Sequence, residues 1–350
     1  SLSTEGFYKI WFPPEALGIT YKDGFGEIKE TYRTVGKKST YKFTVEFDAG
    51  VFGNDPAPEF SLGTSAIDLS IRKTDTNKPN YEVTLSNIEA DGNISINYLT
   101  AGFNAYTGVT YYKDKNTIIN SGQYFPVLER DSFNFYVAFN TDVIEVGDNL
   151  KTIEVKAGSN NVTANITTEF SKEKMKIFKV SVKNVTSSFI IEIPSYLTLS
   201  LKHNFDADSL RFFETTDYVG IHGNEITGDK LTKTVIGGSE YSCVARMKKS
   251  EIFDENSTDI NNSGTMGKLQ FSFGEENPTV INKYYVDGDY VYYTLTTTVN
   301  VSGSVQVKDA YAVTFENAGA VLGFDYPNGG KGIIKGYGNC TFTINFPENS

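Results

Sequence analysis

The segment Tyr81–Ile88, with the sequence YEVTLSNI, alternates apolar and polar residues before an asparagine and one further apolar residue. The same pattern recurs in Phe178–Val185 (FKVSVKNV) and in Tyr311–Ala318 (YAVTFENA). Strict alternation over this length is typical of a β-strand with one buried face, and asparagine tolerates the left-handed backbone of a tight turn. The recurrence therefore predicts three copies of one β-rich unit.

Two further markers precede each copy in the same order. Strand-like runs lie 40, 45 and 70 positions upstream of the pattern, at Tyr41–Phe47, Phe133–Phe139 and Tyr241–Met247. A glycine that begins an apolar segment lies upstream again, at Gly18, Gly108 and Gly220. Short alternating strands at turn-rich spacing indicate antiparallel β-sandwiches. We expect an all-β chain of three tandem domains at residues 1–105, 106–215 and 216–350, the last one enlarged within residues 248–282.

The composition agrees with this fold class and argues against several kinds of partner. Of the 350 residues, 14% are aromatic, and Tyr and Phe suit half-buried strands. The net charge is −11, from 32 Lys and Arg against 43 Asp and Glu, so the surface would repel nucleic acids and anionic membranes. No segment approaches the ~20 apolar residues of a membrane span, and we expect no membrane insertion.

With these three markers, the chain resembles the tandem immunoglobulin-like or related β-sandwich repeats of bacterial surface proteins and of phage tail or fibre proteins. The resemblance covers most of the chain. It implies a stalk, spacer or adhesive role, with the protein extracellular, on a cell surface or on a virion.

The segment KYYVDGDYVYY, residues 283–293, is the clearest candidate for a functional surface. Its Asp-Gly pair predicts a two-residue hairpin turn that places Tyr285 opposite Tyr290. The odd-numbered residues from 291 to 301 have the pattern of a core-facing row. The other face then carries four residues of interest: Lys283, Tyr285, Tyr290 and Tyr292. Such a group either packs across strands or under a neighbouring element, contacts a protein partner, or stacks on sugar rings.

The only tryptophan, Trp11, lies in the aromatic segment FYKIWFPP of residues 7–14. Alternation places Phe7, Lys9 and Trp11 on one side of a strand and Tyr8, Ile10 and Phe12 on the other. A single tryptophan in such a strand belongs either to a core or interface, or to an edge strand that docks on another chain.

Other chemistry-bearing residues give weaker patterns. The two cysteines, Cys243 and Cys340, either form one disulfide or remain separate buried thiols. The two histidines, His203 and His222, do not belong to a cluster at metal-ligand spacing. No local motif supports a catalytic triad or a cofactor site. We expect no catalytic residue, no metal and no cofactor.

Three hypotheses about function follow. The first is a non-enzymatic structural or adhesive protein that acts through protein partners or self-assembly. The second is a carbohydrate-binding surface protein that uses exposed tyrosines. The third is a glycoside hydrolase, which would need two carboxylates about 5–10 Å apart in a concave pocket.

Overall fold

The structure, a computed structural model, describes residues 6–14, 16–120, 122–203, 209–216, 222–252, 269–308, 310–314 and 331–335. Over these residues the chain is all-β, with mostly antiparallel sheets and only short helical turns, which confirms the expected fold class. The chain separates into two compact units. Unit 1 holds residues 1–140 and 154–193, and unit 2 holds residues 141–153 and 194–350.

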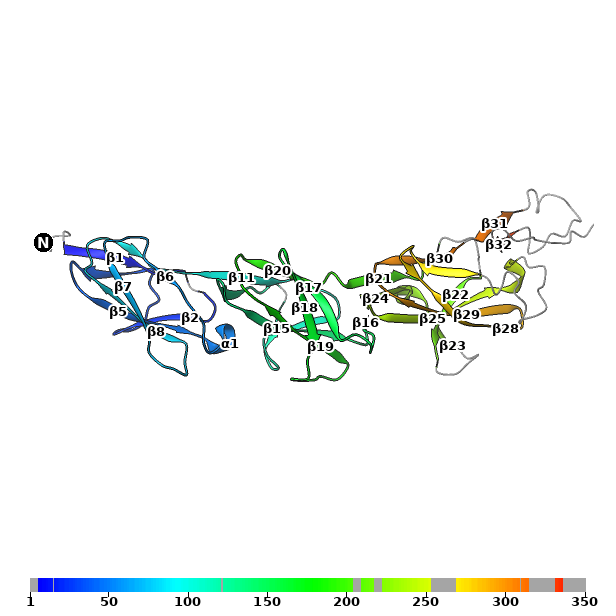
Figure 1. Cartoon of the computed structure of the whole chain (residues 1–350), viewed down its shortest axis with the longest axis horizontal. Coiled ribbons are helices and arrows are strands. Elements are labelled where there is room, and N and C mark those ends of the chain that lie inside the picture. The colour runs from blue at the N-terminus through cyan, green and yellow to red at the C-terminus, as the bar shows by residue number, and fades with distance from the viewer. Residues whose placement is uncertain are drawn as a thin grey trace, which may run out of the picture. The chain divides into compact units, whose positions relative to one another are not determined.

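Residues 7–96 of unit 1 form the first strand arrangement, here called repeat 1 (Figure 1). It has a five-stranded sheet β3-β2-β5-β8-β7, a three-stranded sheet β4-β1-β9 and a short pair β10-β6. Its elements are β1 (Phe7–Trp11), β2 (Ile19–Asp23), β3 (Gly26–Glu27), β4 (Tyr32–Gly36), β5 (Tyr41–Phe47), α1 (Ala49–Phe52), β6 (Phe60–Ser61), β7 (Asp68–Lys73), β8 (Asn80–Ser86), β9 (Gly92–Asn93) and β10 (Ser95–Ile96).

Repeat 2 covers residues 98–192 without the segment 141–151. Its strands form one nine-stranded sheet in the order β13-β12-β15-β19-β18-β17-β20-β11-β14. They are β11 (Tyr98–Phe103), β12 (Val109–Tyr112), β13 (Ile118–Ile119), β14 (Phe125–Leu128), β15 (Phe133–Asn140), β17 (Thr152–Ala157), β18 (Asn160–Ile166), β19 (Met175–Val182) and β20 (Phe189–Glu192).

Repeat 3 covers residues 196–308 of unit 2, and the earlier strand β16 joins one of its sheets. It has a five-stranded sheet β23-β22-β25-β29-β28 and a six-stranded sheet β16-β24-β21-β30-β26-β27. The elements are β16 (Ile144–Glu145), β21 (Tyr196–Ser200), β22 (Arg211–Thr215), β23 (His222–Glu225), η2 (Gly228–Leu231), β24 (Thr232–Ile236), β25 (Glu240–Lys248), η3 (Lys249–Glu251), β26 (Gln270–Phe273), β27 (Asn277–Pro278), β28 (Val280–Asp287), β29 (Tyr290–Thr298) and β30 (Gly303–Lys308). A separate antiparallel pair follows, β31 (Ala310–Thr314) with β32 (Lys331–Lys335).

One pairing scheme recurs in all three repeats. The opening strand (β1, β11 or β21) pairs antiparallel with the fourth strand (β4, β14 or β24) and parallel with a closing strand (β9, β20 or β30). The central strand (β5, β15 or β25) lies between the second strand of the repeat and a partner strand (β8, β19 or β29). The sequence recurrence therefore corresponds to a recurrence of strand order.

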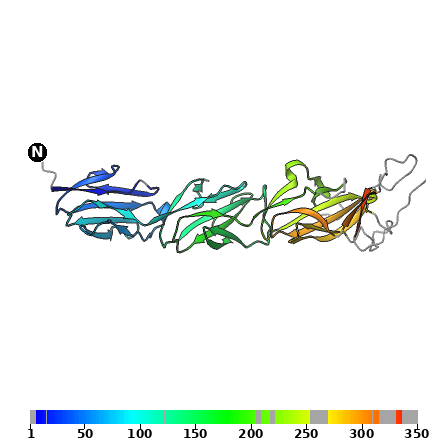
Figure 2. The ribbon, with the colours of Figure 1, turned by 90° about the horizontal axis from the view of Figure 1, so that it is seen from above.

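In repeat 1 the two sheets bury their facing sides in one core, and Figure 2 shows the strands of this repeat in two layers, with β1, in dark blue, in one of them. The ring of Phe12, which follows the opening strand, lies 5.2 Å from that of Phe43 in the central strand. In repeat 2 the corresponding rings of Phe103 and Phe135 are also 5.2 Å apart. Alternation in the central strands thus supplies the buried row between the two layers.

The asparagine of the recurring pattern ends the partner strand in a left-handed turn. Asn87 and Asn184 have φ angles of 52° and 53°, a conformation that asparagine tolerates better than most residues. The next residue is buried and accepts a backbone hydrogen bond from the turn before the central strand. This bond joins Lys38 N to Ile88 O at 2.8 Å and Arg130 N to Val185 O at 2.7 Å. The pattern therefore includes a specific closure between two loops.

The third copy of the pattern is not where the sequence places it. The partner strand of repeat 3 is β29, in which Tyr293 lies opposite Ala245, as Tyr81 lies opposite Val45. The closing bond runs from Gly238 N to Val299 O, without an asparagine before the acceptor. Because repeat 3 lacks this asparagine, the pattern is not recognisable there. The segment proposed instead begins in β31.

The glycine marker of the third copy does not lie at the start of the second strand. The second strand of repeat 3 is β22, whereas Gly220 lies outside the described residues. Repeats 2 and 3 begin with their opening strands, β11 and β21. Both starts lie upstream of the domain boundaries expected at 105 and 215, because the opening strand precedes every sequence marker on which those boundaries were based. The division into three domains stays a prediction, as does an immunoglobulin-like topology.

The left-handed turn at Asn184 makes a prediction about stability. Replacing Asn184 by Val should destabilise repeat 2 by about 1–2 kcal/mol, because a β-branched residue is strained at positive φ. Replacing it by Gly should change the stability little, since glycine adopts this backbone without strain. Urea unfolding followed by circular dichroism measures both. Equal losses for the two variants would show that the turn does not need this conformation.

Candidate functional surfaces

The predicted tyrosine hairpin forms with a different register. Its two-residue turn is Gly288-Asp289, with Gly288 at a φ of 55°, so Tyr285 pairs with Tyr292 and not with Tyr290. The observed register differs from the predicted one by two residues. Because the side-chain period of a strand is two, each side chain still lies on the face of the sheet that the sequence predicted. Val291, Tyr293 and Leu295 are buried in the core, as expected.

The three predicted tyrosines lie together on the outer face of the sheet β23-β22-β25-β29-β28. The ring of Tyr292 is stacked between two others, those of Tyr285 at 4.7 Å and His222 at 5.0 Å. The guanidinium of Arg246 lies over the rings of Phe213, at 4.9 Å, and Tyr290, at 4.5 Å. The sequence analysis had grouped the tyrosines with Lys283, whose side chain is outside the described part of the structure.

We call Tyr285, Tyr290 and Tyr292 and the side chains that contact them the aromatic cluster. The sequence analysis did not assign three of its members to this group: Phe213, His222 and Arg246. They come from β22, β23 and β25, far from the hairpin along the chain. Their alternation within each strand would have placed them on an outer face, but only strand pairing brings the strands together. No local signal joins them to the tyrosines.

Other members of the aromatic cluster cover most of the ring faces within it. Tyr292 is 7% exposed and Phe213 is 5% exposed, since the neighbouring rings and Arg246 cover them. A sugar stacks on a free ring face, whereas both faces of Tyr292 already have partners. The arrangement therefore favours cross-strand packing, one of the interpretations that the sequence left open.

Trp11 lies on a more open surface in repeat 1. Phe7, Lys9 and Trp11 point to the outer side of β1, and Tyr32 lies opposite Trp11 on β4. We call these four residues the Trp11 face. Phe7 is 50% exposed, and Trp11 and Tyr32 are each 37% exposed. The rings of Trp11 and Tyr32 are 4.9 Å apart, and the Lys9 ammonium lies 4.5 Å from the Tyr32 ring centre.

The other repeats show what the fold requires at the position of Trp11. The register of the opening strands aligns Trp11, paired with Asn93, with Gly102, paired with Ile190, and with Ser200, paired with Ser304. A Cβ atom on Gly102 would lie 2.9 Å from the ring of Tyr124, so that tyrosine covers the glycine. Glycine, serine and tryptophan are thus all compatible with this strand. The fold does not require the tryptophan.

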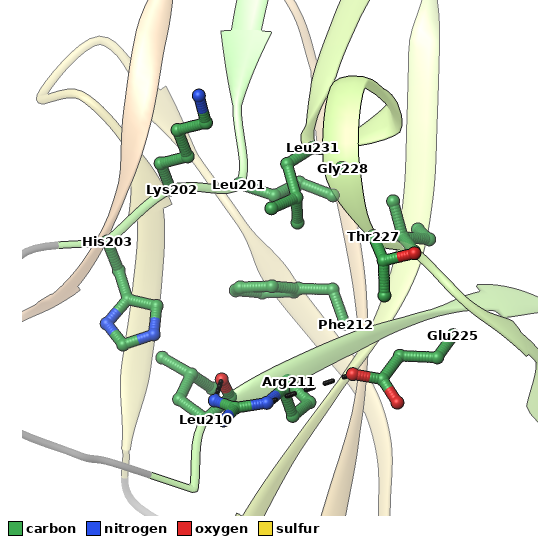
Figure 3. A pocket seen from close by; sticks show the side chains of 11 residues that line it. Leu201, Lys202, His203, Leu210, Arg211, Phe212, Glu225, Thr227, Gly228 and Leu231 are labelled. Atoms are coloured by element: carbon green, nitrogen blue, oxygen red, sulfur yellow. Dashed lines mark hydrogen bonds and ion pairs between the residues drawn. The ribbon is translucent and has the colours of Figure 1, made fainter.

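A pocket of about 320 Å³ opens beside β22 in repeat 3 (Figure 3). Phe212 lies in its middle, and Leu201 and Leu231 contribute further apolar lining. The guanidinium of Arg211 lies 3.8 Å from the carboxylate of Glu225. Glu225 is the only carboxylate in the lining that the structure describes, so the described residues of this pocket do not include the pair that a glycoside hydrolase needs.

Cys243 is a free thiol buried in the core of repeat 3. Cys340 lies outside the described residues, so the choice between one disulfide and two separate thiols stays open. Burial raises the pKa of the Cys243 thiol to about 12. In the described part of the chain, no three His, Cys, Asp or Glu side chains are grouped to hold a metal ion. No helix there is long and apolar enough to cross a membrane.

Comparisons of the chain with protein families, with curated proteins and with solved structures found no match.

The two aromatic surfaces should respond differently to truncation. Tyr292→Ala should destabilise unit 2 by about 3 kcal/mol, because it removes a buried ring from a packed cluster. Trp11→Ala should cost only about 1 kcal/mol, the size of one exposed aromatic pair. Urea unfolding of both variants measures the difference. Equal costs would mean that the Trp11 face is also a packing element.

Because Cys243 is buried, we expect its thiol to be unreactive in the folded protein. Since its pKa is raised, the neutral thiol persists in the folded state, and iodoacetamide at pH 8 should leave Cys243 unmodified. The contribution of this group to stability is complete below its ordinary pKa of 9 and decreases as the pH rises towards 12. Peptide mapping by mass spectrometry, with and without urea, tests this. Modification of Cys243 in the native protein would contradict it.

Proposed function

We propose that the chain is a non-enzymatic structural or adhesive protein that acts through protein–protein contacts on a cell surface or virion appendage. The Trp11 face is the contact surface in this proposal. One observation carries it, namely that repeat 1 exposes Trp11 where the equivalent opening strands have Gly102 and Ser200. An exposed tryptophan that the fold does not need is best explained by a partner, since Trp and Tyr dominate the binding energy of interfaces.

The chemistry of the Trp11 face favours a protein partner over a sugar. The Lys9 ammonium lies over both rings, 5.6 Å from the centre of Trp11 and 4.5 Å from that of Tyr32. A stacked sugar would have to displace this cation from the ring faces. A protein partner can pack against the ring edges and the exposed Phe7 while the cation–π contacts remain.

Trp11 is the only tryptophan of the chain, so its fluorescence reports on this surface directly. We expect a blue shift of the emission when the chain self-associates at high concentration or binds its protein partner, because contact removes water from the indole. Light scattering on the same samples measures the assembly state. Tyr32→Ala should weaken the association about tenfold or more, which is the usual effect of losing an interface aromatic.

Tyr124→Ala is a matched control for this experiment. Tyr124 is 58% exposed and occupies in repeat 2 the position next to Gly102, as Tyr32 does next to Trp11. Its removal should leave the Trp11 emission and the association unchanged. A blue shift with glycans and not with proteins would favour the carbohydrate-binding hypothesis instead. Cleavage of an oligosaccharide would favour the hydrolase.

A further inference from the structure

The connection between β15 and β17 of repeat 2 folds as part of the other compact unit. Residues 141–151, here called the junction segment, leave repeat 2 after β15 and return to it at β17. They belong to unit 2, whereas the chain up to residue 140 and the chain from residue 154 to residue 193 belong to unit 1. The junction segment is therefore a piece of unit 2 whose two ends are covalently anchored in unit 1.

Within unit 2, the junction segment adds a strand to the sheet that contains β24. Its strand β16 pairs parallel with β24, with Ile144 opposite Thr234 and Glu145 opposite Val235. The Ile144 side chain is 1% exposed. The Glu145 carboxylate lies 3.9 Å from the ammonium of Lys233. Strand pairing, a buried apolar side chain and an ion pair thus hold β16 in place.

The rest of the junction segment packs on the turn between β24 and β25. The backbone N–H of Gly147 donates to Ser239 Oγ at 2.9 Å, and Ser239 is buried. Leu150 covers Gly238, because a Cβ atom on that glycine would lie 3.2 Å from Leu150 Cδ2. The same turn makes the closing bond of repeat 3, from Gly238 N to Val299 O at 2.7 Å. The junction segment therefore supports the loop closure of repeat 3.

The equivalent connection of repeat 1 contacts the same element of the following repeat. The connection after the central strand β5 contains α1, which contacts β14, the fourth strand of repeat 2. Phe52 of α1 packs against the core cluster that contains Leu128 of β14. In repeats 1 and 2, the connection after the central strand thus packs on the fourth strand of the next repeat. Repeat 1 does this with an apolar contact, and repeat 2 does it with a paired strand.

We propose that the junction segment couples the stability of the two units, so that opening of either unit weakens the other. If repeat 2 opens, the ends of the segment are no longer held, and docking of β16 costs more conformational entropy. If β24 and its turn open, the docked segment becomes a free loop of repeat 2. A coupling free energy is reciprocal, so each unit must respond to a change in the other.

This coupling deepens the structural role proposed above and rests on that role for its biological meaning. A structural protein bears load, and local opening of one unit is then opposed by the other. All the contacts that carry the inference lie between described residues of unit 2. They do not involve the Trp11 face.

Two substitutions in the full chain test the coupling, with hydrogen exchange and mass spectrometry as the readout. Val180→Ala removes buried volume from the core of repeat 2 and should speed exchange in residues 232–236 of unit 2 about fivefold. Val291→Ala does the same in the core of repeat 3 and should speed exchange in residues 133–139 of unit 1 by a similar factor. Each readout lies in the unit that does not contain the substitution.

A second set of variants tests whether the junction segment transmits these effects. Ile144→Ala weakens the docking of β16, so in this background Val180→Ala should no longer change exchange in residues 232–236. Val143→Ala is the matched control, because Val143 is the neighbouring residue and is 46% exposed, and the effect should persist in its presence. Ser239→Ala removes only the acceptor of the Gly147 N–H and should reduce the effect without a loss of core volume.

Two results would overturn the proposal. One is exchange in residues 232–236 and 133–139 that responds only to a substitution in the same unit. The other is transmission that neither Ile144→Ala nor Ser239→Ala reduces, because it would then not pass through the junction segment. The association monitored by Trp11 emission plays no part in these measurements. Failure of the coupling is therefore distinguishable from failure of the proposed contact at the Trp11 face.

Discussion

The contact between the opening strand and the central strand is the interaction on which each repeat depends. In repeats 1 and 2 it is an aromatic pair, Phe12 with Phe43 and Phe103 with Phe135. In repeat 3 a pair of smaller residues, Leu201 and Cys243, belongs to the same buried cluster. These side chains lie at equivalent positions in the register, so the burial of apolar surface at this position holds the opening strand and the central strand of each repeat together.

The opening strand is also the element that connects packing with function. It pairs on both edges, so its backbone is held in place whatever side chains it presents to solvent. The side chains on its inner face pack in the core and are apolar. The residue at one outer position differs between the repeats, as Trp11, Gly102 and Ser200 show. The proposed contact surface thus lies on the solvent-facing side of an opening strand, where the fold does not restrict the side chain.

Local alternation could be read from the sequence with good results. It placed Trp11 and Lys9 on one side of a strand, and it placed Val291 and Tyr293 in the core, because the side-chain period of a strand is two whatever the strand pairs with. It failed where a position depends on the neighbouring strand. The hairpin turn moved by one residue to Gly288-Asp289, and the third partner strand was missed because its turn has no asparagine.

The sequence by itself determined the all-β class, the recurrence of one unit and the side of each strand that faces the core. These properties depend on residues a few positions apart, and alternation records them directly. Only the tertiary structure decided that His222 stacks on Tyr292, that Tyr32 meets Trp11 and that Gly102 is the equivalent of Trp11. Such relations depend on which strands pair and in which register. Many distant residues determine that choice together through the burial of a common core, so no short segment contains it.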